Sequence, residues 1–134
     1  MSAKFTFEVE PERDLVRISM GGFFRAADIE DFIEARRVAH QALRCAPNAH
    51  LTINDLRGMS IQSNDMVDAF KGMLAAPEYR SRRLAFIVGY TLARAQAIRA
   101  LESRDARWFE DPAKAEAWLF ADDEAEMPLR RAVR

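Results

Sequence analysis

The densest group of polar side chains able to do chemistry lies between positions 55 and 65. The group comprises Asp55, Arg57, Ser60, Ser63, Asn64 and Asp65. A serine hydroxyl could accept a phosphate here, while Asp55 and Arg57 could recognise charged groups. The alternative is structural, with Ser63 capping a helix, Asp65 complementing its dipole and Asp55 pairing with a nearby arginine. We predict a recognition or phospho-acceptor turn and keep the structural roles as the alternative.

A second candidate is an arginine cluster ahead of a buried apolar run. It consists of Arg80, Arg82 and Arg83. Three guanidinium groups could hold a phosphate or an acidic partner. The alternative is a solvated loop with weak surface ion pairs. The cluster is therefore a candidate anion contact.

Phe23 and Phe24 form the third candidate, because neighbouring side chains in extended chain point to opposite sides. Both rings cannot face one core. We predict that one lines an apolar pocket or an interface, and the alternative is simple packing under the helix that follows.

The sequence carries no pattern typical of an enzyme or a metal site. His40 and His50 are isolated, and Cys45 is the single cysteine. There is no glycine-rich phosphate loop, HExxH motif or nucleophile elbow. We predict no catalytic residue, no metal and no cofactor.

Alternating hydrophobic periods indicate the elements that position these residues. The pattern predicts a hairpin over 4–20 and further strands over 50–56, 84–90 and 107–109. It predicts helices over 26–43, from 63 or 64 to Pro77, from Thr91 through Leu101, and from Pro112 onward. Gly21-Gly22 should release the chain from the hairpin.

The first two helices show apolar faces at a spacing near 3.6 residues. The face of the first helix contains Ile29, Phe32, Ile33, Ala39 and Leu43. The face of the second contains Met66, Val67, Phe70, Met73 and Leu74. Val38 falls on the polar side of the first helix and indicates either a partner surface or a single exposed apolar residue.

The element order is therefore β-β-α-β-α-β-α-β-α. Parallel neighbours need crossover connections, so this alternation predicts an α/β fold with a mainly parallel mixed sheet and flanking helices. The first hairpin should supply an antiparallel edge. We expect one domain over 1–121, followed by a polar, frayed tail over 122–134.

Composition narrows the function classes. The 134-residue chain has a net charge of −1, 49% hydrophobic and 31% charged residues. Such a balance argues against a broad nucleic-acid footprint. We expect a cytoplasmic location, because one cysteine suits a reducing compartment and no segment is typical of a signal peptide or a membrane span.

Three segments carry a family resemblance that extends over about residues 4–121. They are Ile53-Asn54-Asp55-Leu56-Arg57-Gly58, the strand Leu84–Tyr90, and Arg107–Pro112 with Ala117-Trp118-Leu119. On these segments the chain resembles the STAS (SpoIIAA-like) family, most closely the small bacterial STAS/SEC14-like proteins. The resemblance implies a SpoIIAA-like fold and a binding or regulatory module.

The sequence departs from the family pattern at one position that bears on function. In the anti-sigma-factor antagonists of this family, the corresponding turn holds an Asp-Ser-Ser-Gly motif whose serine is phosphorylated. Here Gln62-Ser63-Asn64-Asp65 stands at that place, without Ser-Ser-Gly. The phosphorylation switch therefore does not carry over directly.

These observations rank three functional hypotheses. The first is a non-enzymatic module that acts through protein–protein contacts, with a regulatory partner or as a homodimer. The second is a carrier of a small apolar or lipid-like ligand, with a pocket of roughly several hundred Å³ near Phe23 and Phe24. The third is a small enzyme of unknown class.

Overall fold

The fold is an α/β sandwich built on one five-stranded sheet. The computed structural model describes residues 2–89, 94–95, 98 and 106–121. Its strands are β1 (Lys4–Glu10), β2 (Leu15–Gly22), β3 (Leu51–Met59), β4 (Arg83–Ile87) and β5 (Arg107–Phe109). Its helices are α1 (Ala26–His40), α2 (Asn64–Ala75) and α4 (Pro112–Leu119), with short 3₁₀ turns at Pro11–Arg13 and Pro77–Tyr79. Most of the helix predicted over 91–101, and the tail 122–134, lie outside the described residues.

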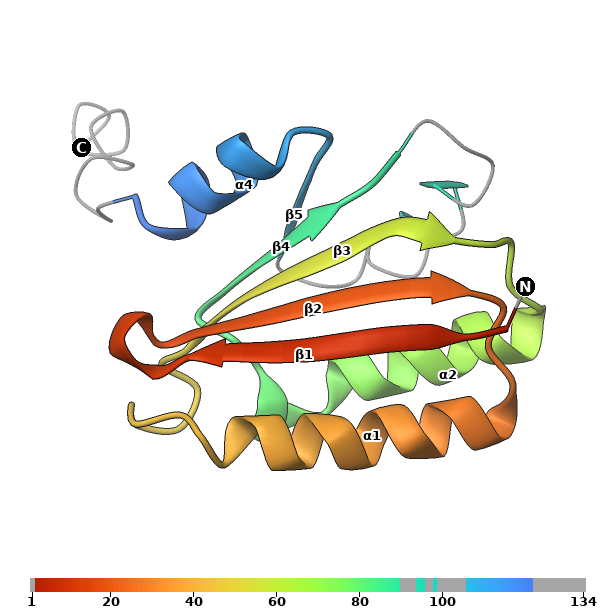
Figure 1. The fold of residues 1–134 in the computed structure, drawn as a ribbon, viewed down its shortest axis with the longest axis horizontal. Helices are drawn as coiled ribbons and strands as arrows, with labels where there is room; N and C mark the ends of the chain where they lie inside the picture. Colours follow the sequence, from red (N-terminus) through yellow and green to blue (C-terminus); the bar gives the residue numbers. More distant parts are fainter. Residues whose placement is uncertain (1, 90–93, 96–97, 99–105, 122–134) are drawn as a thin grey trace, which may run out of the picture.

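The strands lie in the order β1-β2-β3-β4-β5. β1 and β2 form the antiparallel hairpin, and every later pairing is parallel, which confirms the predicted mixed sheet (Figure 1). The carboxyl ends of β2, β3 and β4 therefore lie at the same end of the sheet. Open α/β sheets usually bind their ligands at this end.

Helices cover both faces of the sheet. α1 and α2 lie on one face and α4 lies on the other (Figure 1). Because side chains alternate along a strand, Val16 and Ile18 of β2 face α1 and α2, whereas Leu15 joins Ala115 and Leu119 of α4. The core is therefore split into two apolar layers by the sheet.

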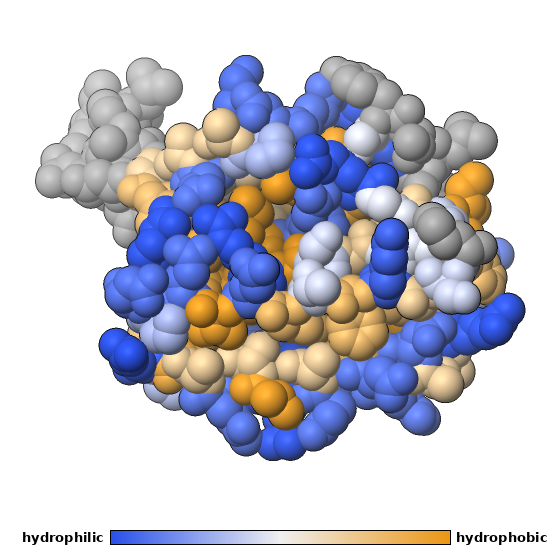
Figure 2. Space-filling model, viewed as in Figure 1, coloured by the Kyte–Doolittle hydropathy of each residue, from blue (hydrophilic) through white to orange (hydrophobic). Residues whose placement is uncertain are grey.

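The apolar layer beneath α1 and α2 extends to β1, the edge strand of the sheet. Phe5, Phe7 and Val9 of β1 are partly buried against it, and Ile33 of α1 is exposed nearby. In the space-filling view, apolar side chains form a band over β1 and α1 between hydrophilic surroundings (Figure 2). β1 therefore covers the side of the apolar layer that lies beneath α1.

Two strands extend further than the sequence predicts. β2 continues through Gly22, where a glycine is required: its φ is +81°, and a Cβ would lie 2.0 Å from the Ser2 carbonyl oxygen. β3 continues three residues beyond Leu56, to Met59, because Gly58 and Met59 pair with the end of β2. The polar segment that was predicted as a turn therefore begins as a strand.

Helix starts follow the predicted caps. The Ser63 hydroxyl accepts a hydrogen bond from the Met66 backbone N–H at 3.2 Å, and Asp111 caps α4 through the Ala113 N–H at 2.9 Å. α1 ends at His40, three residues earlier than predicted. No helix within the described ranges combines the length and apolar character needed to cross a membrane.

The predicted inner face of α1 is wrong at Ile33, whose side chain is 41% exposed. Ile29 and Phe32 are buried as predicted. The next inward positions at helical spacing are Arg36 and His40, both half-buried. The second half of α1 therefore directs two polar side chains toward the sheet, where an apolar face was predicted.

Candidate functional site

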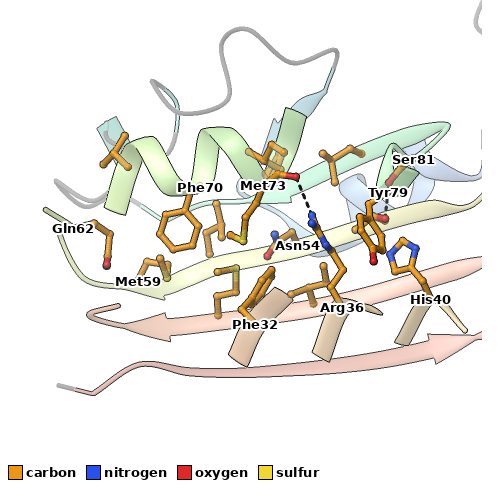
Figure 3. A pocket seen from close by; sticks show the side chains of 18 of the residues that line it. Phe32, Arg36, His40, Asn54, Met59, Gln62, Phe70, Met73, Tyr79 and Ser81 are labelled. Atoms are coloured by element: carbon orange, nitrogen blue, oxygen red, sulfur yellow. Dashed lines mark hydrogen bonds between the residues drawn. The ribbon is translucent and has the colours of Figure 1, made fainter. Parts of the chain in front are cut away.

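A cavity of about 100 Å³ lies between the sheet and the helices α1 and α2. We call it the central cavity. Its floor comes from β2, β3 and β4, and its walls come from α1, α2 and the segment 79–81 (Figure 3). The cavity lies where the inward-facing side chains of these elements do not fully interlock.

One part of the central cavity is apolar. Phe32 of α1, Met59 of β3, and Phe70 and Met73 of α2 line it (Figure 3). Methionine side chains are unbranched and flexible, so this wall can adapt its shape to an apolar group. Met73, which the sequence placed on the buried face of α2, therefore lines a cavity instead of filling the core completely.

The opposite part of the central cavity contains a guanidinium group. Arg36 Nη1 donates to the Met73 carbonyl oxygen at 2.9 Å, and the guanidinium carbon lies 4.0 Å from the centre of the Tyr79 ring. Arg36 Nε is buried and finds no hydrogen-bond partner in the described part of the chain. Burial lowers the pKa of Arg36, with Tyr79 and Glu78 opposing the shift. The side chain still holds its charge, because arginine does not lose its proton in proteins.

Two histidines complete this polar end. The rings of His40 and His50 meet edge to face with centroids 4.6 Å apart, and His40 also packs against Tyr79 at 4.9 Å. Burial, the neighbouring His50 and the charge of Arg36 lower the pKa of His40 to about 4. Burial also lowers the pKa of His50. Both imidazoles are therefore neutral near pH 7, with the charge of Arg36 acting on His40 and the charge of Asp14 acting on His50.

A short hydroxyl chain runs along the same end. Ser81 Oγ lies 2.6 Å from Thr52 Oγ1 and 3.3 Å from His50 Nε2. A serine beside a histidine is the minimal arrangement for nucleophilic catalysis. The distance between the serine oxygen and the histidine nitrogen is then normally about 2.6–3.2 Å. Here the serine hydroxyl is shared with Thr52 at the shorter distance. The geometry favours a hydrogen-bonded wall over an activated nucleophile.

Asn54 is the most unusual polar residue of the cavity floor. Its side chain is 7% exposed and projects from β3 toward the space between α1 and α2 (Figure 3). The amide oxygen Oδ1 is buried, with no hydrogen-bond partner among the described residues. An unpaired buried polar atom costs about 1–3 kcal/mol, so Asn54 carries unused bonding capacity.

The predicted polar group is divided between two faces of the sheet. Asp55 and Arg57 lie on β3 and form a bidentate pair, with Arg57 Nε 3.0 Å and Nη2 2.7 Å from the carboxylate oxygens. Burial opposes the charge of Asp55, but hydrogen bonds from the Arg57 side chain and backbone outweigh it, so the pKa of Asp55 is lowered. This pair corresponds to the structural alternative for Asp55.

The remainder of the predicted group lies around the β3–α2 turn, residues 60–63. Ser60 lines the central cavity, whereas Ser63, Asn64 and Asp65 are exposed at the start of α2. The Ser63 hydroxyl is occupied as the helix cap. The structure therefore brings Ser63, Asn64 and Asp65 together at the start of α2, pairs Asp55 with Arg57 elsewhere on β3, and places Ser60 in the cavity wall.

Gln62 is the residue of this region that sequence reasoning missed. Its side chain is buried; Nε2 donates to the carbonyl oxygens of Gly22 and Ser60 at 2.9 and 2.7 Å, and Oε1 accepts from the Phe24 N–H at 2.8 Å. Gln62 thus fastens the β3–α2 turn to the end of β2.

The three predicted arginines do not converge. Arg83 is buried on the α4 side of the sheet and donates to the carbonyl oxygens of Trp118 and Ala121 at 2.7 and 2.9 Å. Arg80 and Arg82 are exposed. Because Arg83 satisfies the carboxyl end of α4, it has a structural role.

Phe23 and Phe24 point in opposite directions, as expected for neighbouring extended residues. Phe24 is fully buried and packs edge to face on Phe70 with centroids 5.4 Å apart, while Phe23 is 37% exposed. Neither ring is among the described side chains that line the central cavity. The cavity therefore lies near Phe24, separated from it by Phe70 and Gln62, but neither predicted ring contributes to its wall.

A second, polar hollow of about 280 Å³ lies on the α4 face of the sheet. Arg17, Asp55, Arg57 and Glu116 contribute to its lining. Arg17 forms ion pairs with Glu10 and Glu116, and these partners raise the pKa of Arg17. Arg17, Asp55, Arg57 and Glu116 are thus paired within the chain, unlike Arg36.

The described residues hold no group of three or more histidine, cysteine, aspartate or glutamate side chains suited to a metal ion. The polar groups of the central cavity are hydrogen-bond donors and neutral rings, arranged beside an apolar wall. Such an arrangement can bind a small molecule with one polar end.

Fold and site together define a SpoIIAA-like α/β domain with a cavity under its two sheet-covering helices. The structure is similar to a protein of unknown function with a SpoIIAA-like fold from Shewanella loihica, with a TM-score of 0.64, 15% identity, and coverage of 88% of this chain and 94% of that one. It is also similar to an anti-sigma factor antagonist from Mycobacterium paratuberculosis, with a TM-score of 0.56, 11% identity and coverage of 88% and 96%. These similarities confirm the predicted fold. No protein-family model and no curated protein sequence matches the chain.

Proposed function

We propose that this protein is a non-enzymatic regulatory module that acts through protein–protein contacts. The fold that it shares with an anti-sigma factor antagonist supports this proposal. The proposed contact surface consists of the β3–α2 turn, the start of α2 and the end of β2.

One observation carries the proposal: two exposed apolar side chains occupy neighbouring segments that the structure fastens together. Phe23 is 37% exposed and Ile61 is 51% exposed. The Ser60 N–H donates to the Gly22 carbonyl oxygen at 3.2 Å, and Gln62 bonds to both segments. A fixed apolar pair beside the polar residues at the start of α2 has the composition of a protein contact, with an apolar centre and a polar rim.

The partner is a protein, and a second copy of this chain is one such partner. A dimer built on this surface would be isologous, so Phe23 of each copy would contact the same surface of the other. Light scattering after gel filtration distinguishes this case from a different protein partner.

The test is affinity capture from an extract of the native host with matched variants. Phe23→Ser combined with Ile61→Ser removes the apolar centre, and Ser63→Ala and Asp65→Ala probe the polar residues at the start of α2. Ile33→Ser is the control, because Ile33 is similarly exposed on α1. We expect the double variant to lose the partner while the control retains it. Equal recovery by all four variants and the wild type would refute the contact surface.

The central cavity supports a second function, the carriage of a small apolar ligand. The cavity measures about 100 Å³, smaller than the expected pocket of roughly several hundred Å³, so the ligand must be small. Native mass spectrometry of protein purified from its own host would detect a co-purifying molecule. A spectrum with the mass of the bare chain under several mild ionisation conditions would argue against a resident ligand.

A further inference from the structure

The charge of Arg36 is not neutralised within the described part of the chain. Each salt bridge found there involves other residues. Arg36 Nη1 donates a hydrogen bond to the Met73 carbonyl oxygen, and the guanidinium group packs on the Tyr79 ring. These two contacts fix the guanidinium group in place. The buried Nε–H group remains without an acceptor. A fixed guanidinium with a free donor edge is the group that proteins use to bind carboxylates.

His40, Thr52 and Ser81 line this end of the central cavity beside Arg36, and His50 packs behind them against His40 and Ser81. These groups add no charge near pH 7, and the Glu78 carboxylate attracts Arg36 from outside the cavity lining. Neutral imidazoles and hydroxyl groups can each donate one hydrogen bond to an anion. The polar end therefore offers one positive charge and several neutral donors.

Asn54 provides a second, independent indication of a ligand. It is more than nine-tenths buried, faces the central cavity and has an unpaired amide oxygen. Turning the amide by 180° would present its NH₂ group instead, because the oxygen and nitrogen positions are nearly equivalent in shape. The amide can thus complement either a hydroxyl or a carboxylate.

The apolar wall sets the size of the rest of the ligand. A cavity of about 150 Å³ holds a benzene molecule, with six carbons, in another protein. The central cavity is about 100 Å³, and its methionines, including Met59 and Met73, can move to enlarge it. By this proportion the cavity as it stands holds about four carbons, and movement of the methionines would extend this to about six.

We propose that the central cavity binds a small amphiphile with a carboxylate head and a short apolar body. Arg36 binds the carboxylate, Asn54 forms a hydrogen bond to the ligand, and the apolar body packs among Phe32, Phe70 and Met73. This inference rests on the second proposed function, the carriage of a small apolar ligand, and it adds the chemistry of the head group.

The test is isothermal titration calorimetry with three probes that share a six-carbon chain: hexanoate, hexanol and hexylammonium. We expect hexanoate to bind, hexanol to bind at least about tenfold more weakly and hexylammonium not to bind, because a charge-assisted hydrogen bond is absent or replaced by repulsion. Equal affinity for hexanoate and hexanol would overturn the head-group inference and leave the carrier function standing. Absence of binding by both would overturn the carrier function as well.

Variants assign the effect to Arg36. Arg36→Gln should weaken hexanoate binding about tenfold or more and leave hexanol binding within about twofold, whereas Arg36→Lys should restore part of the loss. Arg37→Gln is the matched control, because Arg37 is the next residue on α1 and is exposed and paired with Glu34. Unchanged hexanoate affinity in Arg36→Gln would refute the role of Arg36. If that variant does not fold, the three-probe comparison on the wild type decides the inference alone.

Discussion

The central cavity and the β3–α2 turn use polar side chains in opposite ways. Around the turn, side chains bond to their own chain: Ser63 caps α2, and Gln62 bonds to three backbone groups. In the cavity, Arg36 and Asn54 hold buried atoms without partners among the described residues. A dense run of polar residues in a sequence therefore does not locate unused bonding capacity.

This difference also separates the two proposed contacts. The turn offers a fixed, exposed surface that a protein can cover, and its apolar centre is Phe23 and Ile61. The cavity offers a small, partly open space with one charged side chain in its wall. The first suits a macromolecule, and the second suits a small molecule. The predictions below test this contrast, beginning with the largest expected effect.

Gln62 joins the turn to the end of β2, so its loss should have the largest effect on stability. Gln62→Leu leaves the buried Phe24 N–H without its acceptor and removes the Gln62 donor from the Gly22 carbonyl oxygen, which keeps only the bond from the Ser60 N–H. We expect the free energy of unfolding to fall by about 2–4 kcal/mol, measured by urea titration. Gln41→Leu at the exposed end of α1 is the control. A loss below about 1 kcal/mol would show that the turn is not held by this side chain.

Asn54 should show the opposite sign. Asn54→Leu removes a buried polar group that lacks a partner and replaces it with an apolar group of similar volume. We expect a gain of about 1–2 kcal/mol in the free energy of unfolding, together with weaker hexanoate binding. Thr52→Val is the contrasting variant, because the Thr52 hydroxyl is bonded to Ser81 and its loss should destabilise the fold. If Asn54→Leu is as destabilising as Thr52→Val, Asn54 has a structural partner in solution.

The histidines of the cavity predict a pH dependence. The pKa of His40 is about 4 in the folded chain and about 6.5 when unfolded, so the unfolded state binds the proton more readily. The contribution of neutral His40 to the free energy of unfolding is therefore fully present above pH 6.5 and is lost as the pH decreases toward 4. Between pH 7.5 and 5 we expect a loss of about 1 kcal/mol, a value reduced for the partial exposure of the ring.

Replacement of the ring isolates this effect. His40→Phe should reduce the dependence between pH 7.5 and 5, measured by urea unfolding at each pH, and the remaining slope should belong to His50, whose pKa is also lowered. The carboxyl groups with lowered pKa values contribute in the same direction, but only near and below their ordinary values, so this window excludes most of their effect. A wild-type stability that rises on acidification to pH 5 would contradict the burial of neutral histidines.

The Asp55–Arg57 pair should have the smallest effect. It is bidentate, but Arg57 is exposed, so a double-mutant cycle with Asp55→Ala and Arg57→Ala should give a coupling of about 0.2–1 kcal/mol that decreases with salt. A coupling above about 2 kcal/mol would mean that this pair is as buried in solution as the cavity residues.

Most of the fold could be predicted from local patterns. Alternation predicted the β1–β2 hairpin, and Ser63 and Asp111 marked helix starts that the structure confirms. The end of β3 was missed because Arg57 and Gly58 have weak strand preference, and their pairing with β2 depends on a distant segment.

The central cavity could not be predicted in the same way. Arg36 and His40 continue the inward face of α1 from Ile29 and Phe32, so their spacing was a visible signal. Their residue types favoured a solvent-facing position, and Ile33 was placed inward in their stead. Asn54 gave no signal, because its burial depends on how α1 and α2 pack over β3.

The account depends most on the claim that the central cavity binds a small carboxylate-headed amphiphile. The direct measurement is a ¹³C-methyl spectrum of the methionines during titration with hexanoate. Met20, Met59 and Met73 line the cavity, whereas Met66, near the start of α2, is not among its lining residues. We predict saturable shifts of the three cavity methyl groups and little change at Met66, with the shifts abolished in Arg36→Gln and preserved in Arg37→Gln. Unchanged cavity methyl groups, or equal shifts at Met66 and in both variants, would contradict the account.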